Sequence, residues 1–159
     1  MSWILGKLKW LLLIGAVGGP AMAYFGYTGA EEIRDVLARG QEATATIDSG
    51  TIRKGRKSGT SYSINLSWAD KSGKKQSAEK VSITSRLADQ IIVGDKIVRD
   101  AVKIKYLADA PETKPVILED ADLKLSNNQE MVPLGIGAGV IGALGSAFFL
   151  WRRKQAASV

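Results

Sequence analysis

An uncharged, apolar run late in the chain constrains the fold more than any other feature. Residues 131–151 read MVPLGIGAGVIGALGSAFFLW and contain no Asp, Glu, Lys or Arg. About 20 such residues are what an α-helix needs to cross a hydrocarbon core roughly 30 Å thick. A surface helix of a soluble protein keeps a polar face, and this run has none. We therefore predict a membrane-spanning helix at 131–151.

A second uncharged run occupies residues 10–30, directly after two lysines. It predicts a first membrane helix within residues 1–39, in which the polar segment 31–39 continues the helix out of the membrane until Gly40 ends it. The membrane protein would then have two spans, with one domain between them.

A cleavable signal peptide is the open alternative for the first run. Basic residues, a short apolar stretch and small residues before a cleavage point after Ala23 are typical of such peptides. The apolar sequence continues past Ala23 through Phe25 and Tyr27, which favours a retained span. Both readings place the following domain on the same side of the membrane.

The distribution of charge indicates topology. The net charge is +6, yet all 16 acidic residues lie at positions 31–130. Five basic residues lie in the end segments, including the tail 152–159, where Lys and Arg favour the cytoplasmic side. These anchors are Lys7, Lys9, Arg152, Arg153 and Lys154. We predict that both termini are cytoplasmic and that the domain is periplasmic or extracellular. The pattern argues against a nucleic-acid partner and for contact with membrane lipids.

The composition removes several kinds of chemistry. The chain contains no Cys and no His, so it has neither disulfides nor the commonest general base and transition-metal ligand. We predict no cofactor, no metal and no enzymatic activity.

The middle of the chain changes to a period of two. Residues 61–68 alternate strictly between apolar and polar side chains, and the alternation predicts a half-buried strand. A turn at 70–73, with Gly available for positive φ, predicts a hairpin into the next strand. Weaker strands are expected at 43–48, 74–83, 102–106 and, as a short edge strand, 116–118. A short helix or turn is expected at 84–92, with Thr84 or Ser85 as its N-cap.

Several short strands in roughly 80 residues are typical of a small antiparallel β-barrel or sandwich. We therefore predict a mainly β protein. Its β-domain, at 40–118, is inserted between the two transmembrane helices. The polar residues 119–130 are predicted to be a linker back to the membrane.

Small residues in the two apolar runs predict helix packing. Glycines four positions apart let two backbones approach closely, and membrane helices associate through such contacts. The candidates are Gly15, Gly19, Gly135, Ala138, Gly139, Gly142 and Ser146. The alternative is that these residues are merely common in membrane spans and pack against nothing particular.

Other candidates are weaker. A basic hairpin tip could contact anionic lipid or a partner, although a solvated loop is the simpler interpretation. It comprises Arg53, Lys54, Arg56 and Lys57. Ser77 and Lys80 match a Ser-x-x-Lys pattern, but a strand sends residues three apart to opposite faces.

The acidic run Glu119, Asp120 and Asp122 lacks the spacing of a Ca²⁺ loop and reads as solvated. Tyr62 and Trp68 could line a ligand pocket, but aromatic residues at period-two spacing are more often core.

Several motifs in the middle of the chain carry a resemblance to a known family. They are Gly40 followed by Ala43-x-Ala45, the hairpin from Trp68 to Gly73, Val93-Gly94-Asp95-Lys96-Ile97, and the stretch from Val102 to Pro111. On these, the segment from Gly40 to Leu118 resembles the domain-of-unknown-function 3592 family of bacterial membrane proteins. The residues 98–101 are extra relative to that pattern. The resemblance implies a small extracytoplasmic β-domain held by membrane helices, with no catalytic residues to carry over.

The predicted function is therefore interaction. We expect a non-enzymatic interaction or accessory subunit of a membrane complex in the bacterial inner membrane. Its spans would pack against another integral membrane protein or a copy of itself, and its β-domain would contact the external face of that partner. The alternative is a membrane-anchored module that binds or senses an envelope ligand. A hydrolase would depend on Ser77 and Lys80 alone.

Overall fold

The computed structural model describes residues 2–55, 59–94 and 96–156, with only the backbone described at 2–6 and 152–156. The elements, in chain order, are α1 (Ser2–Arg39), β1 (Gln41–Gly55), β2 (Gly59–Ala69), β3 (Lys75–Ile83), α2 (Ser85–Ile91), β4 (Ile92–Val93), β5 (Lys96–Ile97), β6 (Ala101–Tyr106), β7 (Val116–Ile117) and α3 (Leu118–Ala156).

The prediction of a mainly β protein is wrong, because about 52% of the chain is helical and 33% is strand. Both apolar runs continue into polar flanks as single helices, α1 with 38 residues and α3 with 39. The predicted linker at 119–130 is part of α3. Its acidic residues Glu119 and Asp120 lie in the first turn, where negative charge favours the helix dipole.

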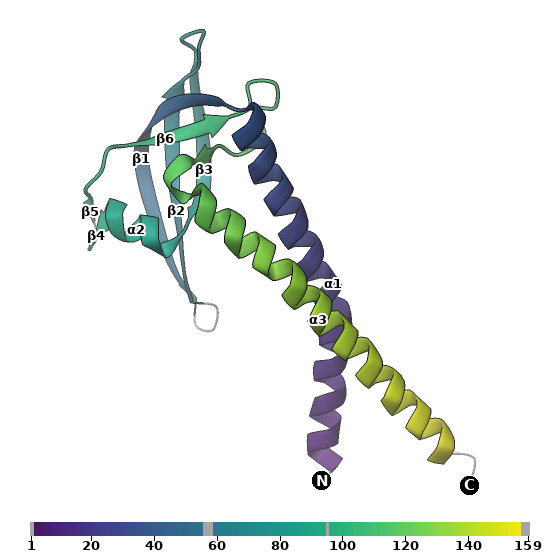
Figure 1. Cartoon of the computed structure of the whole chain (residues 1–159). Coiled ribbons are helices and arrows are strands. Elements are labelled where there is room, and N and C mark those ends of the chain that lie inside the picture. The colour runs from purple at the N-terminus through teal and green to yellow at the C-terminus, as the bar shows by residue number, and fades with distance from the viewer. Residues whose placement is uncertain (1, 56–58, 95, 157–159) are drawn as a thin grey trace. The chain divides into compact units, whose positions relative to one another are not determined.

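The chain divides into two units. The first comprises Met1–Glu31 and Ser126–Val159, and the second comprises Glu32–Leu125. The first unit is built from most of α1 and α3, which run antiparallel as a helical pair (Figure 1). The second contains the sheet, α2 and the polar ends of the two long helices.

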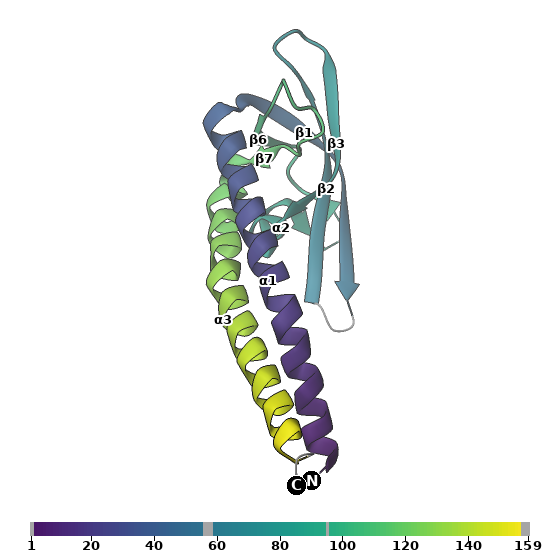
Figure 2. The ribbon, with the colours of Figure 1, turned by 90° about the vertical axis from the view of Figure 1, so that its right-hand side faces the viewer.

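The sheet of the second unit is antiparallel and open, with the strand order β3-β2-β1-β6-β7 (Figures 1 and 2). The predicted strand at 61–68 is confirmed within β2, and the predicted edge strand is confirmed as β7. A barrel or sandwich was the wrong architecture. A barrel would require the edge strands to pair, but β7 has two residues and continues directly into α3.

A helix, rather than a second sheet, covers the buried face. Leu87, Ala88 and Ile91 of α2 are buried in the same cluster as the inward residues of the strands. Thr84 is the N-cap of α2, as predicted, and its side chain accepts from the Leu87 amide. The β4–β5 ribbon is too short to form another layer. The strand residues of this cluster are Ala45, Ile47, Ile64, Leu66, Trp68, Val81, Ile83, Val102, Ile104, Tyr106 and Ile117.

The turn between β2 and β3 is held by one aspartate. The Asp70 carboxylate accepts from the Ser72 amide at 2.9 Å and from its hydroxyl at 2.6 Å. Gly73 has a φ of +81°, which a residue with a Cβ rarely adopts. Hydrogen bonds from Ser72 and Gln76 lower the pKa of Asp70 to about 2.

A second apolar cluster joins the ends of the long helices within this unit. Ile33 and Val36 of α1 pack with Val116 and Ala121, and the loop residue Leu107 completes the cluster. The second unit therefore holds the end of α1 next to the beginning of α3.

Two stretches, Lys7–Arg39 and Leu118–Trp151, are long and apolar enough to cross a membrane by length and composition. Few of their apolar residues are buried, in contrast with the core helix of a soluble protein. Leu11 and Leu144, for example, are 64% and 68% exposed. The chain thus carries two candidate membrane spans.

Candidate functional site

The small residues singled out in the two apolar runs lie where α1 and α3 meet. A Cβ added to Gly19 would lie 2.5 Å from the Gly135 carbonyl oxygen, and one added to Gly135 would lie 2.5 Å from the Ala23 amide nitrogen. Both separations are shorter than any real Cβ contact. The backbones of the two helices therefore touch directly at these points.

The same contact continues toward the chain ends. A Cβ on Gly142 would lie 2.6 Å from the Leu12 carbonyl oxygen, and one on Gly15 would lie 3.2 Å from the Ala138 carbonyl oxygen. Gly139 faces the ring of Pro20, with its Cδ at 3.0 Å from an added Cβ. We call this set of backbone contacts between α1 and α3 the glycine seam.

The seam also includes residues that the sequence analysis missed. A Cβ on Gly26 would lie 2.7 Å from the Asn128 carbonyl oxygen, and one on Gly29 would lie 2.8 Å from the Asn128 side-chain nitrogen. The signal was present in the spacing, since Gly15, Gly19 and Gly26 follow the 3.5-residue repeat of a left-handed helix pair.

Composition alone could not separate these glycines from their neighbours. No atom in the described part of the chain lies within 4 Å of a Cβ added to Gly18 or to Gly137. The seam is therefore a property of particular helix faces. Its residues are occupied by contacts between two helices of one chain.

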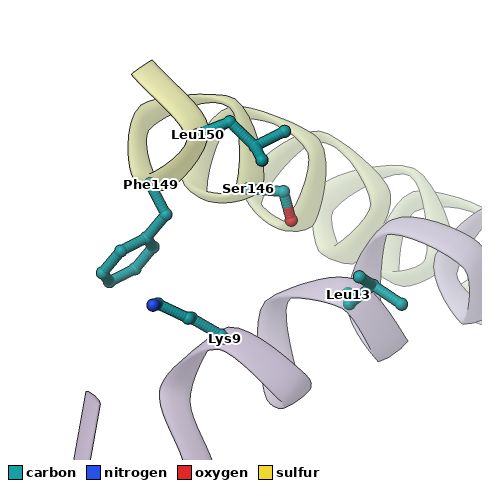
Figure 3. Close-up of a pocket in the computed structure, with 5 residues that line it drawn as sticks. All are labelled: Lys9, Leu13, Ser146, Phe149 and Leu150. Carbon is teal, nitrogen blue, oxygen red and sulfur yellow. The ribbon is translucent and has the colours of Figure 1, made fainter. Parts of the chain in front are cut away.

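Beyond the seam, the two helices form a small, half-open cavity of about 150 Å³ near the first turns of α1 and the last turns of α3 (Figure 3). Its lining residues are Lys9, Leu13, Ser146, Phe149 and Leu150. The Lys9 ammonium lies 5.6 Å from the centre of the Phe149 ring, which is cation–π distance. Of the other predicted anchors, Lys7 is exposed, and the side chains of Arg152, Arg153 and Lys154 lie outside the described residues.

The basic hairpin tip is described in part. Arg53 and Lys54 are exposed at the end of β1, while Arg56 and Lys57 lie outside the described residues. Arg53 lines an open groove of about 500 Å³ together with Lys80. The other lining residues, nearly all of them hydroxyl-bearing, are Thr51, Thr60, Ser61, Tyr62, Ser63, Ser82, Ile83 and Ser85.

Ser77 and Lys80 lie on β3 and form no hydrogen bond with each other in the part of the chain that the structure describes. Lys80 has a φ of 51°, and its amide donates to the Asn65 side-chain oxygen at 2.8 Å. This irregularity coincides with a register shift between Ile64 and Leu66. The backbone of Lys80 is therefore specialised for a bulge in the β2–β3 pairing.

The acidic residues at the start of α3 have separate roles. Glu119 forms a two-pronged ion pair with Arg99, at 2.6 and 2.5 Å, and this contact lowers the pKa of Glu119. Asp122 is exposed. Among residues 2–55, 59–94 and 96–156, no group of three or more His, Cys, Asp or Glu side chains could hold a metal ion.

Asp120, which sequence reasoning treated as solvated, is buried, with 1% of its surface exposed. It accepts from the Thr84 amide at 3.0 Å and from the Thr84 hydroxyl, and the Lys124 ammonium lies 3.4 Å away. Lys124 also donates to the Ser82 carbonyl oxygen, and burial lowers its pKa. This network fixes the first turns of α3 to the end of β3 and the N-cap of α2.

The two aromatic candidates differ in environment. Trp68 is buried and packs against Tyr106 with ring centres 5.5 Å apart, so it belongs to the core. Tyr62 is half-buried and contributes to the lining of the groove beside Arg53.

Comparison of the chain with protein-family models, with curated protein sequences and with solved structures finds no match. The function is therefore argued from the sequence and from the geometry described above.

Proposed function

We propose that the chain is a non-enzymatic, two-span membrane protein that serves as an accessory subunit of a membrane complex. The observation that carries the proposal is the glycine seam. Backbone contact at Gly19, Gly135 and Gly142 makes the two apolar helices a preformed antiparallel pair. Such a pair anchors the second unit, which lies between the two helices in the sequence, without help from another protein.

Antiparallel spans place both chain ends on one side of the membrane and the second unit on the other. The end segments carry basic residues and no acidic ones, which favours the cytoplasm for both ends. The second unit is then exposed outside the cytoplasm. This arrangement agrees with the family resemblance described above, which is retained as part of the proposal.

The seam also narrows where a partner can bind. Its small residues are in use within the chain, and the outward residues of the spans are large and apolar, as lipid-facing residues are. We expect the second unit to supply the specific contact. The groove that contains Arg53 and Lys80 is the favoured surface, because it combines positive charge with hydroxyl groups that can donate and accept.

The test is purification of the tagged full-length protein in a mild detergent, with mass spectrometry of the proteins that co-purify. We expect one recurrent membrane protein in fixed ratio to the chain. The variant Arg53→Glu should no longer co-purify this membrane protein, whereas Lys71→Glu should still do so. Lys71→Glu is the control because it makes the same charge reversal in the β2–β3 turn. A stable chain that captures no recurrent protein would count decisively against an accessory role.

The groove also supports a second candidate, in which the second unit binds an anionic or hydroxyl-rich polymer of the cell envelope. Two cationic side chains beside several hydroxyls suit phosphate or sugar groups. Full-length protein in nanodiscs would be titrated with teichoic acid and with neutral dextran. Saturable binding of the first polymer, lost in Arg53→Glu and kept in Lys71→Glu, would favour this function over the first.

A further inference from the structure

The cavity beside Lys9 exists because the glycine seam ends before the helices do. Leu12 fills the space against Gly145, where an added Cβ would lie 2.6 Å from a leucine methyl carbon. One turn further along α3, Phe149 stands where the seam would need a small residue. The helices diverge toward this end (Figure 1), and a cavity of about 150 Å³ opens between them.

The walls of this cavity are apolar except at two points. Leu13, Leu150 and the Phe149 ring supply carbon surface, while the Lys9 ammonium and the Ser146 hydroxyl are the polar groups (Figure 3). Along α1, Lys9 lies one turn nearer the chain end than Leu13. Along α3, Phe149 and Leu150 lie one turn nearer the chain end than Ser146. Each level therefore holds one polar group beside apolar side chains: Lys9 with Phe149 and Leu150, and Ser146, one turn deeper, with Leu13. We call these three apolar side chains the apolar floor of the cavity.

Among the described residues, Lys9 has no Asp or Glu side chain within reach along α1 or α3. The sequence contains no Asp or Glu at positions 1–30 or 131–159, so Glu31 and Glu130 are the nearest on α1 and α3. At 1.5 Å per residue, Glu31 is about 33 Å from Lys9 along the helix axis. The described partner of the Lys9 ammonium is the Phe149 ring, which occupies one side of a group with three donors.

We infer that this cavity binds one anionic phospholipid from the surrounding leaflet. The lipid phosphate accepts from the Lys9 ammonium, the Ser146 hydroxyl donates to an ester oxygen one turn deeper, and an acyl chain lies along Leu13 and Leu150. The charge argument selects the occupant, because a basic cavity without a carboxylate between two membrane helices complements an anionic head group. The apolar floor distinguishes a lipid from a free phosphate.

This inference rests on the proposed insertion of both helices in a membrane and is independent of any accessory role. The test uses the full-length protein reconstituted with equal amounts of phosphatidylglycerol and phosphatidylcholine, followed by native mass spectrometry of the retained lipid. We expect one phosphatidylglycerol per chain. Reconstitution of the wild type into phosphatidylcholine alone checks insertion separately, so that failure of the site and failure of the proposed function are distinguishable.

Two variants that each remove one positive charge test whether the position of Lys9 in the cavity matters. Lys9→Gln should weaken phosphatidylglycerol retention about fivefold, the factor expected for one basic contact with an anionic lipid. Lys7→Gln should leave it unchanged, because Lys7 does not line the cavity. A third variant, Ser146→Leu, fills the cavity without changing charge and should also reduce retention, with helix content checked by circular dichroism.

Three results would overturn the inference. Equal losses in Lys7→Gln and Lys9→Gln would indicate general attraction of anionic lipid to the basic ends. Equal retention of the two lipids by the wild type would remove the charge argument. Displacement of phosphatidylglycerol by millimolar glycerol 3-phosphate would indicate a site for a free anion, with no role for the apolar floor.

Discussion

Replacing Gly142 with alanine should open the helix pair. The added methyl would lie 2.6 Å from the Leu12 carbonyl oxygen and closer still to the Ala16 amide nitrogen, and ordinary contact begins near 3.4 Å, so the backbones must separate by at least about 0.8 Å. A gap of this size forfeits roughly a quarter to a half of each van der Waals contact, which is worth about 0.1–0.2 kcal/mol. If the crossing holds about as many contacts as one buried leucine, roughly 50, the loss is about 1–5 kcal/mol. The ratio of closed to open pair should fall at least about fivefold.

The matched control is Gly137→Ala on the same helix, because no atom that the structure describes lies within 4 Å of its added methyl. Since the chain contains no cysteine, spin labels can be placed uniquely at Val17 and Val140, both of which are exposed. Double electron–electron resonance should show a longer and broader label distance in Gly142→Ala and no change in Gly137→Ala. Identical distances and identical thermal stability in the two variants would refute the reasoning.

Two further predictions concern the second unit. Asp120→Asn should destabilise the second unit by about 3–4 kcal/mol, because the Lys124 ammonium beside this buried carboxylate loses its counter-charge. Chemical unfolding followed by near-ultraviolet circular dichroism measures the change. The second prediction concerns pH. Hydrogen bonds from Ser72 and Gln76 lower the pKa of Asp70 from the ordinary 3.8 to about 2, so its ionised form contributes stability above pH 3.8 that is lost as the pH falls through about 2. Asp70→Asn should remove this part of the acid limb of an unfolding curve, whereas an unchanged limb would contradict the assignment.

Local patterns predicted the elements whose cause is local. Strict alternation over 61–68 identified β2 because a strand with one buried face needs apolar side chains at every second position. Thr84 was recognisable as one of two N-cap candidates, with Ser85, because a hydroxyl at that position can satisfy an amide of the same turn, as that of Thr84 does. Both apolar runs were recognisable as long apolar helices, and so as candidate spans, from length and composition alone.

The features that the sequence did not reveal depend on distant residues. The segment 119–130 looked like a linker because it is polar, but Ala121 packs in a cluster with Ile33, and Asp120 accepts from Thr84. Neither partner can be read from the segment itself. The prediction of a barrel or sandwich failed for a related reason. The period-two pattern predicted the strands, but it did not predict that the apolar residues of one helical turn in α2 cover the sheet.

The glycine spacing predicted that the spans pack closely, and the expected partner was another membrane protein or a second copy of the chain; in the structure the close contacts join α1 and α3 of one chain. Contacts such as Gly19 with Gly135 join two helices whose adjoining ends are already held together by Ile33 and Ala121 in the second unit. A tether of this kind gives an effective concentration on the order of millimolar, so the same contact between separate chains competes poorly at micromolar concentration. Mixing chains labelled only at Val17 with chains labelled only at Val140 should therefore give no short distance, whereas the doubly labelled chain should give one. A short distance in the mixture would mean that the seam joins two copies, and the subunit would then be a dimer through the faces assigned here to a single chain.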